Sequence, residues 1–261
     1  MSPSPWTHVA ASAPGTAHLK DDTPCQDACE VRVVEGPHGP CLLCAMADGA
    51  GTAELGAEGA RLACDMALDA MGALVEGGGG AAELDRAWAL NWLSAFQTAI
   101  QSRADAAGAV PRAYACTVMV ALIDDRYGVF FQIGDGAMVI PSAGHRGGYD
   151  WVFWPARGEF ANETWFATAS DAELHLEWAL VQGPIEAFAA FTDGLQHLVL
   201  HYETRTAHGP FFDQMFGFVE QAEPGSDLEA PLLSFLSSAS VNERTDDDKS
   251  LILASRRGTQ A

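Results

Sequence analysis

Three uncharged apolar runs of this chain end in the same way, in an aspartate that is followed by glycine. Short runs of this kind, bounded by turn residues, are typical of strands that are buried on both faces. We therefore predict core strands that each carry one carboxylate at the tip. The runs are residues 42–47 before Asp48, residues 129–134 before Asp135, and residues 187–192 before Asp193.

A fourth acidic group, Asp246 to Asp248, stands just before another apolar run, residues 251–254. A single Asp-Gly pair is an ordinary turn signal, but its recurrence at the ends of separate core strands is harder to explain by turns alone. If the strands belong to neighbouring sheets, the carboxylates converge, and converged carboxylates are stable only when a hard cation neutralises them. The pattern therefore predicts a Mg²⁺ or Mn²⁺ site built from aspartates.

The rest of the chain alternates between runs of strands and pairs of helices, rather than strict strand-helix-strand units. This arrangement indicates an antiparallel α+β architecture. The aromatic-rich residues 149–170 are either further sheet or a flap over a site. Further strands are expected at residues 6–11, 29–34, 114–123, 127–133, 137–140, 185–191 and 250–254, and helices at residues 54–76, 82–106, 195–200, 211–221 and 228–238.

Composition narrows the class of protein. A chain of 261 residues that is 48% hydrophobic can bury one large core, so we expect a single domain over residues 1–261. The formal net charge of −21, with Lys20 and Lys249 as the only lysines, argues against nucleic acid or an anionic membrane surface as partner. No apolar run reaches the roughly 20 residues of a membrane helix. We expect a soluble, cytoplasmic monomer.

The cysteines invite a zinc interpretation, because Cys25, Cys29, Cys41 and Cys44 are spaced rather like zinc ligands. On a strand, however, Cys41 and Cys44 would point to opposite faces, so we expect free, buried thiols. None of the six cysteines has an arginine six residues later, and no Gly-x-x-x-x-Gly-Lys-Ser/Thr loop is present. These absences exclude a cysteine-nucleophile phosphatase loop and the P-loop nucleotide hydrolases.

Six short motifs, taken in order, resemble those of the type 2C family of metal-dependent protein serine/threonine phosphatases, in a divergent bacterial form. The resemblance spans nearly the whole chain. It implies an antiparallel β-sandwich flanked by two layers of helices, a four-layer αββα fold, with a binuclear Mg²⁺ or Mn²⁺ centre at one end. The motifs are residues 26–28, 48–51, 115–118, 134–136, 192–194 and 247–250.

The resemblance also implies roles for single residues. Asp48 would bridge the two metals, the Gly49 carbonyl would ligate the second, and Asp193 and Asp247 would ligate the first. Asp27 would orient a metal-bound water. Two hard cations about 4 Å apart can bind a phosphate oxygen and lower the pKa of a bridging water, which then attacks in line without a covalent enzyme intermediate.

Other positions are less regular. Asp135 would help to hold a weaker third metal. Where many members carry a phosphate-binding arginine, this chain has Asp22. His18 and Lys20 are the nearby cationic substitutes, and His18 resembles a histidine of a bacterial subgroup. Asp248 replaces a usual asparagine. These departures put phosphate affinity and substrate choice in question more than metal binding.

The predicted function is metal-dependent hydrolysis of phosphoserine and phosphothreonine in proteins. A phosphorylated protein is the expected partner, and a serine/threonine kinase is a natural guess from the chemistry, although no residue proves one. Two alternatives stay open: a catalytically weak, phosphatase-like binding module that has lost its phosphate-grasping cation, and a phosphatase that acts on small phosphoesters.

Overall fold

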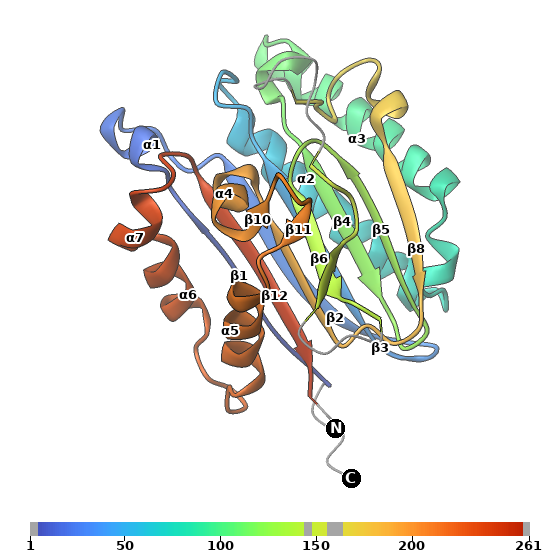
Figure 1. The fold of residues 1–261 in the computed structure, drawn as a ribbon. Coiled ribbons are helices and arrows are strands. Elements are labelled where there is room, and N and C mark those ends of the chain that lie inside the picture. Colours follow the sequence, from blue (N-terminus) through green and yellow to red (C-terminus); the bar gives the residue numbers. More distant parts are fainter. Residues whose placement is uncertain (1–4, 144–147, 156–163, 258–261) are drawn as a thin grey trace.

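Two antiparallel β-sheets stacked face to face form the centre of the molecule (Figure 1). The computed structural model describes residues 5–143, 148–155 and 164–257. One sheet has the order β1 (Trp6–Ala13), β12 (Lys249–Arg256), β9 (Ala187–Phe191), β6 (Ala137–Pro141) and β7 (Tyr149–Trp151). The other has the order β2 (Asp27–Gly36), β3 (Gly39–Asp48), β4 (Val118–Ile123), β5 (Tyr127–Ile133) and β8 (Glu177–Gln182).

Helices cover the outer face of each sheet, which confirms the predicted four-layer α+β arrangement (Figure 1). The long helices α2 (Gly56–Glu76) and α3 (Arg86–Ala107) lie on the sheet that contains β3. Helices α5 (Gly209–Glu220) and α6 (Glu229–Leu236) lie on the sheet that contains β12. The short elements are α1 (Thr16–Lys20), α4 (Gln196–Val199), α7 (Ala239–Asn242), β10 (Leu200–His201), β11 (Thr206–Ala207) and the 3-10 turns Ala81–Glu83, Pro111–Tyr114, Ala172–His175 and Asp193–Leu195.

The core explains why the strand sequences carry so few charges. Along β4, Val120 and Leu122 face the helices, whereas Met119 and Ala121 face the opposite sheet. Both faces of a central strand are therefore buried, and a polar side chain on either face would lose its contact with water. A strand of this kind can place a charged residue only where it leaves the sheet, as β3 does at Asp48.

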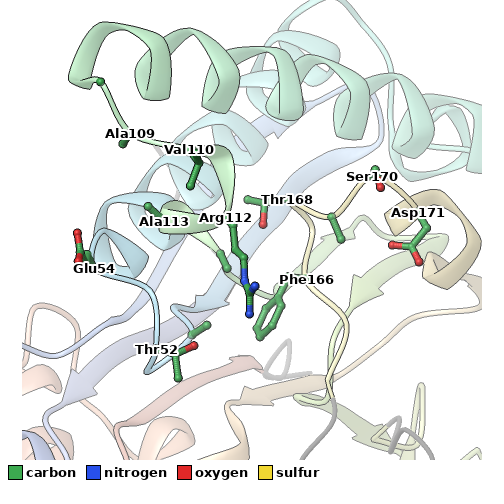
Figure 2. A pocket seen from close by; sticks show the side chains of 14 residues that line it. Thr52, Glu54, Ala109, Val110, Arg112, Ala113, Phe166, Thr168, Ser170 and Asp171 are labelled. Carbon is green, nitrogen blue, oxygen red and sulfur yellow. The ribbon is translucent and has the colours of Figure 1, made fainter.

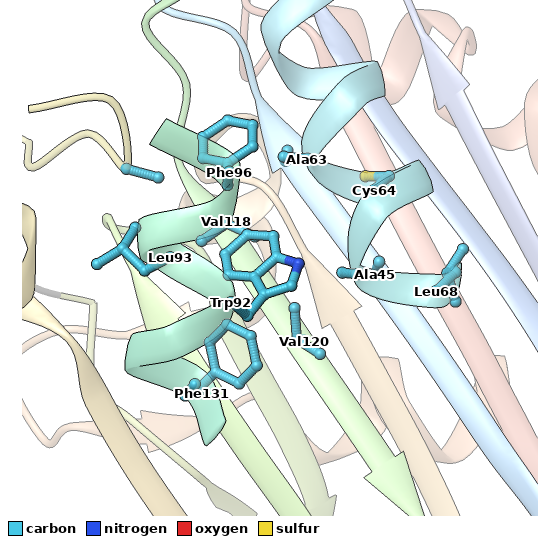
Figure 3. Packing of buried hydrophobic residues seen from close by; sticks show 14 of the residues in the cluster. Ala45, Ala63, Cys64, Leu68, Trp92, Leu93, Phe96, Val118, Val120 and Phe131 are labelled. Carbon is cyan, nitrogen blue, oxygen red and sulfur yellow. The ribbon is translucent and has the colours of Figure 1, made fainter. Parts of the chain in front are cut away.

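Aromatic side chains fill the layer between α3 and the sheet (Figure 3). The ring of Trp92 stacks on Phe96 with 5.4 Å between ring centroids, and it packs at a tilt on Phe131 at the same 5.4 Å. Aromatic pairs at such distances add to the stabilisation from burial alone. The packing fixes α3 against the sheet, and with it the turn that follows the helix.

The two cysteines proposed to lie on opposite faces of one strand do so. Cys41 is buried in the layer under the helices, and Cys44 is buried between the sheets. Both thiols are free, as are those of the other cysteines.

Element boundaries differ from the predictions where turns precede regular structure. The helix expected from residue 82 begins at Arg86, because Ala81–Glu83 forms a 3-10 turn and the Asp85 side chain accepts a hydrogen bond from the Trp88 N–H at 2.7 Å. The strand expected from residue 114 begins at Val118, after the turn Pro111–Tyr114. Strand β8 was not predicted.

The aromatic segment 149–170 is sheet in part, because Tyr149–Trp151 forms β7 at the edge of its sheet. The alternative prediction, that this segment is a flap over a site, involves residues 156–163, which lie outside the described part of the chain. Among the helices of the described ranges, none is both long enough and apolar enough to cross a membrane.

Candidate metal centre at one end of the sandwich

Asp48 is fixed where the central strand β3 leaves its sheet. Its backbone N–H donates to the Thr117 Oγ1 at 3.0 Å, and the Thr117 N–H donates to the Asp48 carbonyl at 2.8 Å. The next residue admits no side chain, because a Cβ on Gly49 would lie 2.5 Å from the carbonyl carbon of Gly56, where α2 begins. The Asp-Gly pair is therefore a close contact between a strand tip and a helix start, and not simply a turn.

The other aspartates arrive at the same end of the sandwich from neighbouring strands. Asp193 follows β9, and Asp247 precedes β12, the antiparallel neighbour of β9. Asp135 lies in the connection from β5 to β6, where the chain crosses from one sheet to the other. A Cβ on Gly194 would lie 2.0 Å from the Asp248 carbonyl oxygen, so the two strand ends are in direct contact.

These side chains line one pocket of about 260 Å³. All the residues predicted to bind metal are on it, together with His18; the set is Asp48, Gly49, Asp135, Asp193 and Asp247. Lys20, the second cation suggested by the sequence, is exposed and is not part of the lining.

The carboxylates lie close enough together to raise one another's pKa values. Burial raises the pKa of Asp48 well above its ordinary value, and the negative charges of Asp27, Asp193, Asp247 and Asp135 raise it further. Burial, followed by Asp135 and Asp247, raises the pKa of Asp193 to about 7. Carboxylates in this situation hold either protons or cations near neutral pH.

The donor set fits hard cations. Oδ1 of Asp193 is buried and has no hydrogen-bond partner among the described residues, as expected for an oxygen that awaits a cation or a proton. Within the same ranges, no three His, Cys, Asp or Glu side chains are grouped closely enough to hold one metal by themselves. Mg²⁺ usually takes one or two carboxylates and completes its shell with water. The pocket therefore suits oxygen-seeking cations that stay partly hydrated.

Asp27 begins strand β2, which lies next to β3 in the sheet. It pairs with Asp48 in the β2–β3 register and is absent from the pocket lining. Its Oδ2 accepts hydrogen bonds from the Thr192 and Ser250 hydroxyls, both at 2.8 Å, while its Oδ1 is buried without a partner in the described structure. Burial raises the pKa of Asp27 to about 8, against the opposing effect of those two hydroxyls. Its negative charge raises the pKa of Asp48.

Asp248, noted above only as a replacement for a usual asparagine, is buried and anchors several segments of the chain. Its Oδ1 accepts from the Gly15 N–H at 2.6 Å and pairs with the His18 Nδ1 at 2.8 Å. Its Oδ2 accepts from the Gln26 N–H at 2.6 Å. The carboxylate thereby ties helix α1, which carries His18, to the start of β12. Nothing in the sequence spacing signals these contacts, since the partners are more than 220 residues apart.

His18 is consequently held at the rim of the pocket. It sits on α1, its ring is bonded through Nδ1 to Asp248, and it lines the same pocket as Asp48 and Asp193. A histidine fixed through one ring nitrogen keeps the other for a second partner.

Comparison with known proteins gives three consistent results. Residues 14–237 match the family described as Protein phosphatase 2C. The chain is 39% identical over 252 residues to serine/threonine-protein phosphatase 3 of Escherichia coli (strain K12), which covers 95% of this chain and 98% of that protein. Solved structures with a similar fold include a bacterial serine phosphatase, with a TM-score of 0.63, 12% identity and coverage of 97% of this chain and 99% of the other. Serine/threonine phosphatase Stp1 from Staphylococcus aureus gives a TM-score of 0.61, 12% identity and coverage of 96% and 95%.

Proposed function

The chain belongs to the protein phosphatase 2C family and is a protein serine/threonine phosphatase, and we propose that it works with two divalent cations, Mg²⁺ or Mn²⁺, held by Asp48, Asp193 and Asp247. The observation that carries this proposal is the convergence of these carboxylates, half-buried at Asp48 and Asp193 and exposed at Asp247, on one pocket where the pKa of each is raised. When bound, such cations neutralise charge on the phosphate and make water acidic enough to act as the nucleophile.

We assign each residue of the pocket to one or both cations according to its position. We assign Asp48, whose pKa is raised by four other carboxylates, to both cations, and Asp193 and Asp247 to one of them. In the described structure these three side chains are not grouped closely enough to hold one cation, so they would have to move together around it when it binds. The Gly49 carbonyl would serve the other. Asp135, in the crossing between the sheets, would help to hold a third and weaker cation. Each assignment uses oxygen donors only, as Mg²⁺ and Mn²⁺ prefer.

The pocket lining supports attack by water. Its described residues include no cysteine, serine or lysine. Of its threonines, Thr117 has its hydroxyl engaged by the Asp48 N–H, and no described histidine or carboxylate is hydrogen-bonded to the hydroxyl of Thr52 or Thr164 as a general base would be. The nearby Cys116 is fully buried, and burial raises the pKa of its thiol, which keeps the sulfur protonated and unreactive. Asp27, with its unpartnered Oδ1 behind Asp48, would orient a water from the second row.

The test is hydrolysis with and without added metal. The purified protein should hydrolyse p-nitrophenyl phosphate only when Mn²⁺ or Mg²⁺ is present, and kcat/KM should be higher for a phosphoserine peptide than for a sugar phosphate. Peptide binding without turnover would instead show a phosphatase-like binding module. A preference for the sugar phosphate would show a small-molecule phosphatase. The substrates of a protein phosphatase are made by a kinase, so a serine/threonine kinase that supplies them is part of the proposal.

His18 is the residue we propose to orient the substrate phosphate in place of the missing arginine. His18→Ala should lower kcat/KM on a phosphopeptide by about tenfold, or about 1.4 kcal/mol, because the phosphate loses a donor at the rim. Lys20→Ala, on the same short helix but off the pocket, is the matched control and should leave kcat/KM unchanged. The Mn²⁺ concentration for half-maximal activity should be the same in both variants. If His18→Ala has wild-type kinetics, His18 has only a structural role, as the partner of Asp248.

A further inference from the structure

A second and larger cavity, of about 890 Å³, adjoins the acidic pocket. Figure 2 shows the residues that line this larger cavity. The cavity and the acidic pocket share one wall, formed by Ala50, Thr52 and Phe166. The rest of the larger cavity is lined by the turn after α3 and by the segment that ends at Asp171. Its volume lies in the range of pockets that bind drug-sized ligands. Nothing in the proposed chemistry uses this space.

Arg112 extends into this cavity toward Phe166 and the loop of Thr52 (Figure 2). It is exposed, and no described residue forms an ion pair or a hydrogen bond with its guanidinium. The two acidic residues of the lining, Glu54 and Asp171, form no ion pair with it. Arg32 and Arg256, by contrast, each pair with carboxylates. On a chain with a net charge of −21, an unpaired arginine beside the active site is available for an external anion.

The backbone that carries Arg112 is rigid. The Ala113 carbonyl accepts a hydrogen bond from the Leu55 N–H at 2.8 Å, which joins the turn to the loop after Asp48. A Cβ on Gly59 would lie 2.1 Å from the Tyr114 carbonyl oxygen, so α2 packs on the turn without a gap. An arginine on a fixed base loses less freedom when it binds than one on a mobile loop. The position of Arg112 is therefore fixed relative to the loop after Asp48 and to α2.

We propose that this cavity binds the substrate segment next to the phosphorylated residue, and that Arg112 pairs there with a carboxylate side chain of that segment. This inference rests on the proposed function. The phosphate group of the substrate would occupy the small acidic pocket. The residues on one side of the phosphorylated residue would then lie in the adjoining larger cavity. Arg112 lines only the larger cavity, whereas His18 lines only the acidic pocket, which places the arginine beside a flanking residue rather than the phosphate itself.

The consequence is a sequence preference. Among the described residues that line the two pockets, Arg112 is the only arginine or lysine, so it is the position at which an acidic flanking residue gains an attractive partner. A phosphosite with an aspartate or glutamate at the matching position should therefore be favoured over one with the neutral amide.

The experiment uses phosphoserine peptides in which a single glutamate is moved along the flanking positions, each compared with its glutamine counterpart. For the wild-type enzyme with Mn²⁺, one position should favour glutamate by about fivefold in kcat/KM, the upper end for a partly exposed ion pair. Arg112→Gln should abolish that preference, and Arg112→Glu should favour lysine at the same position. Neither variant should change kcat/KM for p-nitrophenyl phosphate, which is too small to reach the cavity.

Arg86→Gln is the matched control. It removes the same charge from an exposed position at the other end of α3, a 22-residue helix that is roughly 30 Å long. It should leave the glutamate preference intact.

Two results would overturn the proposal. Equal losses on p-nitrophenyl phosphate and on all peptides would place Arg112 on the scissile phosphate, and an unchanged preference in Arg112→Gln would leave the arginine without a role. If the wild-type protein hydrolyses nothing with Mn²⁺, the catalytic function fails separately. The glutamate preference can then be measured as binding of non-hydrolysable phosphonate peptides, and its absence there would reject the cavity as a peptide site.

Discussion

Asp48→Asn should lower kcat/KM on a phosphoserine peptide by roughly a hundred- to a thousandfold, the scale seen when a preorganised electrostatic group is removed from an active site. The reason is the position of Asp48 at the centre of the acidic group, where four other carboxylates act on it. The substitution keeps the size of the side chain and removes one negative charge. The measurement is steady-state kinetics at saturating Mn²⁺.

The same substitution at the neighbouring aspartates should give a ranking of activity losses with which the Asp48→Asn result can be compared. Asp193→Asn and Asp247→Asn should be nearly as severe, whereas Asp135→Asn should mainly raise the Mn²⁺ concentration needed for activity. A larger loss for Asp135→Asn than for Asp48→Asn at saturating Mn²⁺ would show that the shared ligand is misassigned. Folding provides the control, because relief of repulsion should make metal-free Asp48→Asn at least as stable as the metal-free wild type.

Chelation should abolish activity and lower the melting temperature, and Mn²⁺ or Mg²⁺ should restore both. Without cations, the carboxylates at the end of the sandwich repel one another in a buried setting. A cation present at about 100 times its Kd stabilises the folded state by about 2.7 kcal/mol, which thermal unfolding detects easily. Full activity in excess chelator would rule out a metal-dependent mechanism for this chain.

The effect of pH on metal binding follows from the raised pKa values. Asp193 keeps its proton to about pH 7 when folded but has an ordinary value of 3.8, so the metal-free folded state binds more protons than the unfolded state in that interval. The metal-free fold therefore loses stability as the pH rises from about 4 to about 7, and the loss is complete above pH 7. Cations must displace them, so the Mn²⁺ requirement should fall as the pH rises from 6 to 8. A requirement that does not change with pH would contradict this description of the pocket.

The sequence was most informative about the strands that are buried on both faces. Residues 127–133 were predicted to be a strand and are one, because an uncharged run between turn residues has few other solutions. The convergence of Asp48 and Asp193 on one pocket could also be anticipated, since tips of neighbouring core strands meet at the end of a sandwich. Strand β8 was missed because it lies at a sheet edge and is half-exposed, which weakens its apolar pattern.

Contacts between distant segments could not be predicted. Asp248 reads as one more acidic residue in a cluster, and only the fold brings Gly15, His18 and Gln26 to its oxygens. Arg112 likewise stands in an unremarkable turn, and its relevance depends on a cavity that three separate parts of the chain enclose. Asp27 was predicted to orient a metal-bound water; it is not part of the pocket lining, and the β2–β3 register places it beside Asp48.

The antiparallel pairing of β1 with β12 joins Trp6 to Arg256 and Ala13 to Lys249, and this has a bearing on biosynthesis. Strand β12 separates β1 from β9, so the sheet is divided until residues 249–256 have been made. Asp247 and the anchor at Asp248 are also translated late, which leaves the loop of His18 untethered throughout most of synthesis. A nascent chain can fold α2, α3 and strands β2 to β5 early, but long-range pairing such as that of β1 with β12 forms slowly and late. Phosphatase activity should therefore appear only after residues 249–256 have been synthesised, and translation products that end before them should be inactive.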